Sequence, residues 1–246
     1  MKLLAFETAT EACSVAVYID GDVRERFELA PRRHAELALP WAEQLLAEAG
    51  IARAQLDAVA LGRGPGAFTG VRLAIALAQG IALALDRPLL PVSTLAVLAA
   101  GAPAAQPLAG EGGCAGVEEQ PILAAIDARM GEIYAATFLR DGDRLCATSA
   151  ETVVAPADYV LAGEARGWLG VGTGFAAGDG VLRTRLHDRL AYVDPAALPH
   201  AADLARLAVQ AHARGEAVAP ERVEPAYLRN NVALKLDEQK ALRQAR

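Results

Sequence analysis

A glycine-rich segment in the first half of the chain reads Gly62-Arg63-Gly64-Pro65-Gly66-Ala67-Phe68-Thr69-Gly70-Val71-Arg72. The mostly apolar residues before it, at positions 56–61, predict a buried strand. Glycine and proline then break the strand and permit backbone angles that other residues resist. Thr69 belongs to a residue type that caps helices, and Phe68 with Leu73 has the spacing of a hydrophobic staple. The segment therefore predicts a strand, a tight loop and a helix that is capped by Thr69 and ends at Leu85.

The predicted helix has apolar side chains on every face, so no face is plainly made for water. Its burial within its own domain, contact of one face with a helix of another subunit, and a phosphate cradle in the loop are three open interpretations. The phosphate cradle has the least support, because no Gly-Lys-Ser/Thr follows as in a P-loop. Small residues recur every fourth position in two stripes, Gly70, Ala74 and Ala78, and Ala76, Gly80 and Ala84.

Composition bounds the class of protein. The 246 residues are more than half apolar, which suffices for one large or two modest domains. A net charge of −6 argues against a broad basic surface for nucleic acid. The isolated cysteines Cys13, Cys114 and Cys146 offer neither a disulfide framework nor zinc spacing. Glu7 comes too early for a signal peptide, and the apolar run at 73–85 is too short to span a bilayer, so we expect a cytoplasmic protein without membrane contact.

The opening of the chain recurs after residue 120. An apolar strand ends at Glu7 and another ends at Asp127, and each is followed by a second strand and an Asp-Gly-Asp hairpin turn. This repeat predicts an α/β fold of two duplicated, hairpin-led units. We expect a first unit at 1–104, a linker or loop at 105–120, a second, smaller unit at 121–230 and a flexible tail at 231–246.

Three further helices are predicted. One runs from about Arg33 to Ala49, and its Pro40 suggests that the regular part begins only near Leu39. A short one is capped by Ser93 and runs through Ala100. The third lies at about 200–214 in the second unit and could pack back on the first.

The duplicated units resemble the ribonuclease-H-like, actin-like folds of the ASKHA superfamily. More specific strings resemble the TsaB family, also called YeaZ, over nearly the whole chain. A lone His34 at the start of the first helix fits the same family. The strings are Phe6-Glu7-Thr8-Ala9-Thr10, the glycine-rich segment, Pro91-Val92-Ser93-Thr94-Leu95, Asp127-Ala128-Arg129 and Pro225-Ala226-Tyr227-Leu228-Arg229.

The resemblance implies a non-catalytic subunit needed to make threonylcarbamoyladenosine, the modified adenosine 3′ to the anticodon of tRNAs that read codons beginning with A. It implies pairing with a catalytic TsaD-type subunit, addition of a TsaE-type ATPase, a homodimer when alone, and contact with tRNA only through the complex. Family members use their first two helices as the interface. The interface residues expected here are His34, Trp41, Leu45, Gly70, Leu73, Ala74, Leu77, Ala78 and Ile81.

The catalytic relatives carry a His-x-x-x-His pair that can bind one metal ion. The corresponding positions here are Thr94 and Leu98, so the resemblance implies neither a metal, nor a cofactor, nor catalysis. An enzyme of the same superfamily, either a small-molecule kinase or a glycoprotease-like hydrolase, is the alternative.

Carboxylates at strand ends place magnesium and phosphates in active members of the superfamily. Glu7, Thr8, Asp127 and Arg129 would form a vestigial nucleotide cleft here, although turn and amide-capping roles are favoured for the two carboxylates. His34 could cap its helix, hydrogen-bond across a dimer or simply pack.

Overall fold

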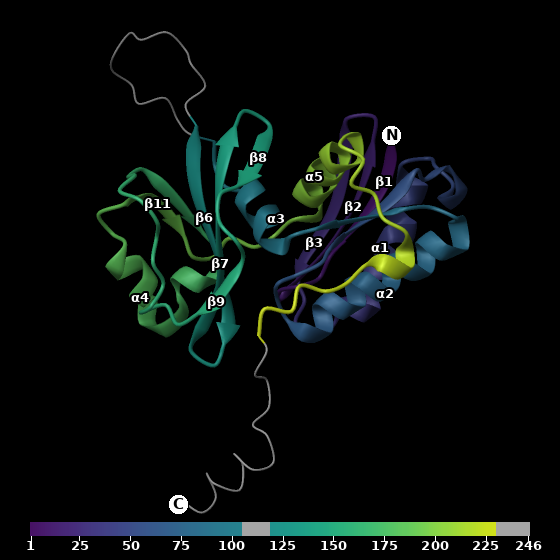
Figure 1. Cartoon of the computed structure of the whole chain (residues 1–246). Coiled ribbons are helices and arrows are strands. Elements are labelled where there is room, and N and C mark those ends of the chain that lie inside the picture. The colour runs from purple at the N-terminus through teal and green to yellow at the C-terminus, as the bar shows by residue number, and fades with distance from the viewer. Residues whose placement is uncertain (105–118, 230–246) are drawn as a thin grey trace, which may run out of the picture.

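A computed structural model describes residues 1–104 and 119–229. Most of the predicted linker, with Cys114, and the predicted tail lie outside these residues. Two sheets stand side by side with helices around and between them (Figure 1). Each sheet begins with an antiparallel hairpin and continues into parallel strands, which confirms the predicted duplicated α/β units.

The first unit has the strand order β3-β2-β1-β4-β5. Its apolar side chains alternate between two covered faces, because successive residues of a strand point to opposite sides. Leu4 and Phe6 of β1 face helices α1 and α2, whereas Leu3 and Ala5 face α5. The elements are β1 (Lys2–Glu7), β2 (Ala12–Ile19), β3 (Asp22–Leu29), α1 (His34–Glu48), η1 (Arg53–Gln55), β4 (Ala58–Gly62), α2 (Phe68–Leu85), β5 (Leu89–Val92), α5 (Ala201–Ala213) and η3 (Pro220–Arg222).

The second unit has the strand order β11-β10-β6-β7-β8, and β9 pairs with β7. Helix α3 packs on one face of this sheet and α4 on the other. Since α5 packs on the first sheet, the chain returns to the first unit after β11. The elements are α3 (Thr94–Ala100), β6 (Gln120–Arg129), β7 (Glu132–Asp141), β8 (Arg144–Ala147), β9 (Thr152–Val154), β10 (Trp168–Val171), η2 (Thr173–Phe175), α4 (Ala177–Arg185) and β11 (Leu190–Asp194).

The predicted cap of α2 is wrong. The helix begins at Phe68, its flanking residue is Ala67, and no side chain caps it. Phe68 is 59% exposed and is itself the first residue of the helix, so it does not stand before the cap as a hydrophobic staple requires. The backbone N–H of Ala67 instead donates to the carbonyl of Ala9 at 2.7 Å. This tertiary hydrogen bond fixes the turn that enters the helix, and Thr69 is left on the surface.

Helix α1 also differs from its prediction, because it runs without interruption through Pro40. Proline removes the bond that its N–H would have donated to residue 36. Both Pro40 and Glu36 are exposed, so this loss occurs at the outer surface of the helix. Burial of Ala38, Ala42 and Leu45 on the inner side stabilises the helix despite the proline.

Candidate functional site

The glycine-rich loop packs directly on the turn between β1 and β2. A Cβ atom on Gly66 would lie 2.3 Å from the carbonyl oxygen of Ala9, and one on Gly70 would lie 1.9 Å from that of Thr8. The hydroxyl of Thr8 donates to the carbonyl of Gly70 at 2.7 Å. These glycines are therefore needed because their backbone packs directly against the backbone of the β1–β2 turn, where a side chain would not fit.

Glu7 lies at the centre of this contact and is buried. Its carboxylate accepts the N–H of Ala9 at 2.9 Å and the hydroxyl of Thr94 at 3.3 Å. Burial raises the pKa of Glu7 to about 7, although these hydrogen bonds oppose the increase. Gly62 leaves the space that the carboxylate fills, since a Cβ there would lie 2.0 Å from Oε2 of Glu7. Glu7 thus joins β1, the glycine-rich loop and the start of α3.

The structure separates the four residues predicted to form a vestigial nucleotide cleft. Glu7 and Thr8 are enclosed beneath the loop, whereas Asp127 and Arg129 line a groove between the two units. Asp127 accepts the backbone N–H of Arg129 at 2.8 Å and pairs with its guanidinium at 3.0 Å. Asp127 therefore holds its own turn. The groove has a volume of about 510 Å³, and its walls include Thr10, His34, Thr69 and Leu73 from the first unit and Asp127, Arg129 and Tyr134 from the second.

His34 ties the start of α1 to the β1–β2 turn. Its Nε2 lies 3.0 Å from the carbonyl oxygen of Thr10 and 3.1 Å from that of Ala12. Because both partners only accept, Nε2 must carry the proton. His34 makes these bonds within its own chain and does not cap α1.

Four of the predicted interface residues are in the wrong place for a partner. Leu45, Gly70, Ala74 and Ala78 are buried in the chain's own structure. The predicted stripe of small residues thus allows α2 to approach its own sheet closely. Trp41, Leu77 and Ile81 are partly buried and pack at the edge of the core, and Leu73 is also partly buried.

The other stripe of small residues points outward. Ala76, Gly80 and Ala84 are exposed, and Leu83 between them is 65% exposed. Together with the partly exposed leucines they form an apolar surface, the α2 outer face, which consists of Leu73, Ala76, Leu77, Gly80, Leu83 and Ala84. Helix α2 is also the one helix in the described ranges that is long and apolar enough to cross a membrane, with a mean hydropathy of 1.7, a test that core helices of soluble proteins pass as well.

An exposed aromatic cluster at the first turn of α2 was not predicted. The guanidinium carbon of Arg72 lies 3.6 Å from the centroid of the Phe68 ring, and its Nε donates to the hydroxyl of Tyr227 at 2.8 Å. Tyr227 comes from the segment after η3, which runs along α2 in Figure 1. Arg72 and Tyr227 both occur in the sequence motifs quoted above. They stand far apart in the sequence, however, and no pattern in those motifs indicates that the two side chains meet.

Comparisons of the sequence and of the structure with known proteins agree with each other. Residues 27–235 match the family model described as tRNA N6-adenosine threonylcarbamoyltransferase, TsaD. The tRNA threonylcarbamoyladenosine biosynthesis protein TsaB of Escherichia coli is 42% identical over 96% of this chain and 97% of its own length. The protein of the same name from Haemophilus influenzae is 34% identical over 96% of each chain. The solved structure of YeaZ from Pseudomonas aeruginosa superposes with a TM-score of 0.77 at 40% identity, covering 92% of this chain and 99% of that one.

Proposed function

Because the chain belongs to the TsaB family of tRNA threonylcarbamoyladenosine biosynthesis proteins, and so acts in that tRNA modification, we propose that it is the non-catalytic subunit of the system. In this proposal it pairs with a TsaD-type catalytic subunit, and a TsaE-type ATPase joins the pair. Alone, it forms a homodimer through the same surface. The chain meets tRNA only through the complex, in keeping with its net charge of −6.

The α2 outer face is the observation that carries the proposal. One side of α2 closes the core through Val71, Ala74 and Ala78. On the opposite side, the small residues of the outward stripe and Leu83 stay exposed among the residues that the structure describes. Soluble proteins rarely leave a contiguous apolar patch without a binding function. Small residues four positions apart let the backbone of a second helix come close. A partner helix is therefore the occupant that this surface fits.

The residues at the positions of the catalytic histidine pair support a non-catalytic role. Thr94 donates its hydroxyl to Glu7, and Leu98 is buried in the core beneath the second sheet. Neither leucine nor a single threonine provides the imidazole ligands that a transition metal needs. These positions serve packing in this chain, and the chemistry falls to the partner.

The match to the TsaD family model supports the choice of partner. A catalytic subunit built on the same fold carries its own helix in the place of α2. Two related helices can then pair across a pseudo-twofold axis, and two copies of this chain can pair in the same way.

Gly80→Glu in α2 tests the interface. A Cβ atom on Gly80 would meet nothing within 4 Å, and glutamate favours a helix more than glycine does. The isolated chain should therefore fold normally, but a charge in the centre of an apolar interface should abolish pairing. Substitutions at Ala74 or Ala78 would not give this test, because both side chains are in the core.

Val160→Glu is the matched control, because Val160 is an apolar residue of the second unit that is 80% exposed. Sedimentation equilibrium and titration against the TsaD-type subunit of the same organism would measure pairing. We expect Gly80→Glu to be monomeric and unable to bind, and Val160→Glu to behave as wild type. Unchanged binding by Gly80→Glu would refute the assignment of this face.

A modification assay tests the catalytic part of the proposal. Purified chain alone should produce no threonylcarbamoyladenosine, and adding it to TsaD-type and TsaE-type proteins should restore the reaction. Turnover by this chain without the TsaD-type protein would contradict the proposal.

A further inference from the structure

Among the described residues, two ion pairs join the two units. In each pair the arginine comes from a segment packed on the first unit and the glutamate comes from the second unit. These are Arg63 with Glu151 and Arg229 with Glu132. We propose that the two pairs form a double latch that sets the separation of the units. We further infer that this separation changes the affinity for the TsaD-type partner, an inference that rests on the proposed function.

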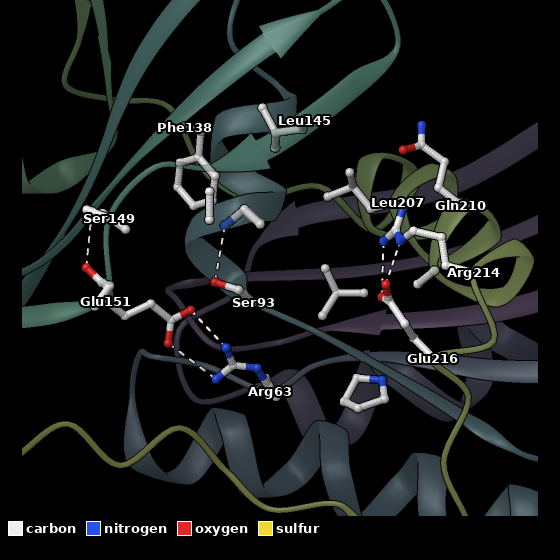
Figure 2. A pocket seen from close by; sticks show the side chains of 17 residues that line it. Arg63, Ser93, Phe138, Leu145, Ser149, Glu151, Leu207, Gln210, Arg214 and Glu216 are labelled. Atoms are coloured by element: carbon white, nitrogen blue, oxygen red, sulfur yellow. Dashed lines mark hydrogen bonds and ion pairs between the residues drawn. The ribbon is translucent and has the colours of Figure 1, made fainter.

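The first pair is bidentate and partly desolvated. Nη2 of Arg63 lies 3.0 Å from Oε1 of Glu151, and Nη1 lies 3.3 Å from Oε2. The side chains of Arg63 and Glu151 are 33% and 16% exposed, so salt screens the pair less than an ordinary surface pair. Figure 2 shows the two facing each other at one end of a cavity between the units, which has a volume of about 490 Å³. Planar, bidentate geometry makes such a contact directional as well as strong.

Arg63 is held rigidly on the side of the first unit. Its N–H donates to the carbonyl of Val92 at 2.8 Å, and its own carbonyl accepts the N–H of Ala226 at 2.9 Å. It also belongs to the glycine-rich loop that leads into α2. The backbone position of Arg63 is therefore fixed by β5 and by the segment after η3.

Glu151 is equally well connected on the other side. It stands immediately before β9, which pairs with Ile133, Tyr134 and Ala135 at the start of β7. Tyr134 is part of the groove wall opposite α2. The first latch thus runs from the entrance of α2 to the far wall of the groove.

The second latch holds the tip of the β6–β7 hairpin. The guanidinium of Arg229 contacts the carboxylate of Glu132 and donates to the carbonyl of Ala128 at 3.3 Å. Arg129 and Met130 at this tip have φ values of +62° and +56°, a left-handed conformation that side chains disfavour. Arg229 lies three residues after Ala226, which bonds to Arg63, so both latches share one support.

The latches act on the surface that the partner would meet. Leu73 belongs both to the α2 outer face and to the wall of the groove. A change in the separation of the units therefore alters the edge of the partner surface without unfolding either sheet. This mechanical link is the reason to expect an effect on binding.

A distance measurement tests the latch without any partner. Spin labels at Gln44→Cys on α1 and Arg183→Cys on α4, in a chain also carrying Cys114→Ser and Cys146→Ser, report the separation of the units by double electron–electron resonance. Glu151→Gln with Glu132→Gln should broaden the distance distribution. Glu151→Arg alone places two arginines together and should also broaden the distribution. Adding Arg63→Glu to that chain restores the first pair in reverse and should narrow the distribution again.

Glu216→Gln is the matched control. It removes the ion pair with Arg214 at the other end of the same cavity, which joins no residue of the second unit (Figure 2). This control should leave the distribution as in the wild type. An unchanged distribution in the double glutamine variant would overturn the latch.

Titration with the TsaD-type subunit tests the second step. The double glutamine variant should bind roughly tenfold more weakly, the order expected for coupled contacts. If the distance distribution broadens but the affinity is unchanged, the inferred effect on binding is wrong, while the latch itself stands. Failure of the wild-type chain to bind would instead overturn the proposed function and leave the distance result standing.

Discussion

Gly62 and the carboxylate of Glu7 occupy one space: a Cβ atom on the glycine would lie 2.0 Å from Oε2 of the glutamate. The glutamate cannot move aside easily, because it is buried and bonded to Ala9 and Thr94. The identity of residue 62 is thus set by a side chain on a neighbouring strand.

Gly62→Ala should consequently destabilise the fold. The methyl group must displace Glu7 from its hydrogen bonds, and overpacking of this kind costs about 1–3 kcal/mol or more in unfolding free energy. Urea denaturation followed by circular dichroism would measure the loss. Gly80→Ala is the control, since its methyl group meets nothing and should stabilise α2 by up to about 1 kcal/mol. Equal stability of Gly62→Ala and wild type would contradict the contact.

Glu7→Gln should remove a pH dependence of stability. The pKa of Glu7 is raised from 4.5 to about 7 by burial, so the folded chain holds a proton that the unfolded chain has lost. Stability from this group is complete below pH 4.5 and is lost as pH rises through about 7. Glutamine keeps the shape without the charge, and it should raise stability at pH 8 by at most about 3 kcal/mol. Unfolding free energies from pH 5 to 9 would show this, and a parallel profile for both proteins would refute it.

His200 should contribute a second decline in the stability of the fold as pH rises. Its Nδ1 lies 3.0 Å from Oε2 of Glu25, and this hydrogen bond raises the pKa of His200 although burial opposes it. Burial raises the pKa of Glu25, but hydrogen bonds from His200, Ser14 and Ala202 together lower this pKa by more than burial raises it. The net shift of the Glu25 pKa is therefore downward. The pair therefore stabilises the fold between these two pKa values and weakens as pH rises through that of His200.

His200→Ala should flatten this part of the profile. It also removes the stacking of His200 on Phe27, whose ring centroid is 4.1 Å away, so some stability is lost at every pH. His187→Ala is a suitable control, because His187 is exposed and its bonds go to the exposed Asp188 and to the nearby carbonyl of Thr184. Thermal unfolding at several pH values would compare the three proteins, and a slope in His200→Ala as steep as in wild type would count against the pair.

Arg72→Ala should loosen the segment that follows η3. Arg72 holds Tyr227 by a hydrogen bond and stacks on Phe68, and an exposed cation–π contact contributes about 0.5–1 kcal/mol. Amide hydrogen exchange should accelerate at Ala226 and Tyr227 and stay unchanged in the strands. Arg53→Ala, which breaks an exposed pair with Glu43, should leave the exchange of that segment unaffected.

Local patterns predicted the architecture well. The apolar strand that ends at Glu7, the second strand after it, the hairpin turns and the repeat after residue 120 all correspond to observed elements. Ser93 was expected to cap α3, and its hydroxyl does accept the N–H of Ala96 at 3.2 Å. These features depend on residues near each other in sequence, so the sequence contains their cause.

The errors concern contacts between distant residues. Both stripes of α2 consist of small residues, and periodicity cannot tell which one meets the sheet. Gly70 settles the orientation because it touches Thr8, a contact between residues 62 positions apart. The start of α2 follows from the bond between Ala67 and Ala9 for the same reason. The Arg63–Glu151 pair joins residues of different units, so it likewise could not be predicted from local sequence patterns.

The outward stripe on α2 also bears on how much of the protein a cell should contain. On the proposed function, a chain that exposes Leu83 and its neighbours to water tends to aggregate when its companion is scarce. We then expect its synthesis to keep pace with that of the companion, and surplus copies to be bound by chaperones or degraded.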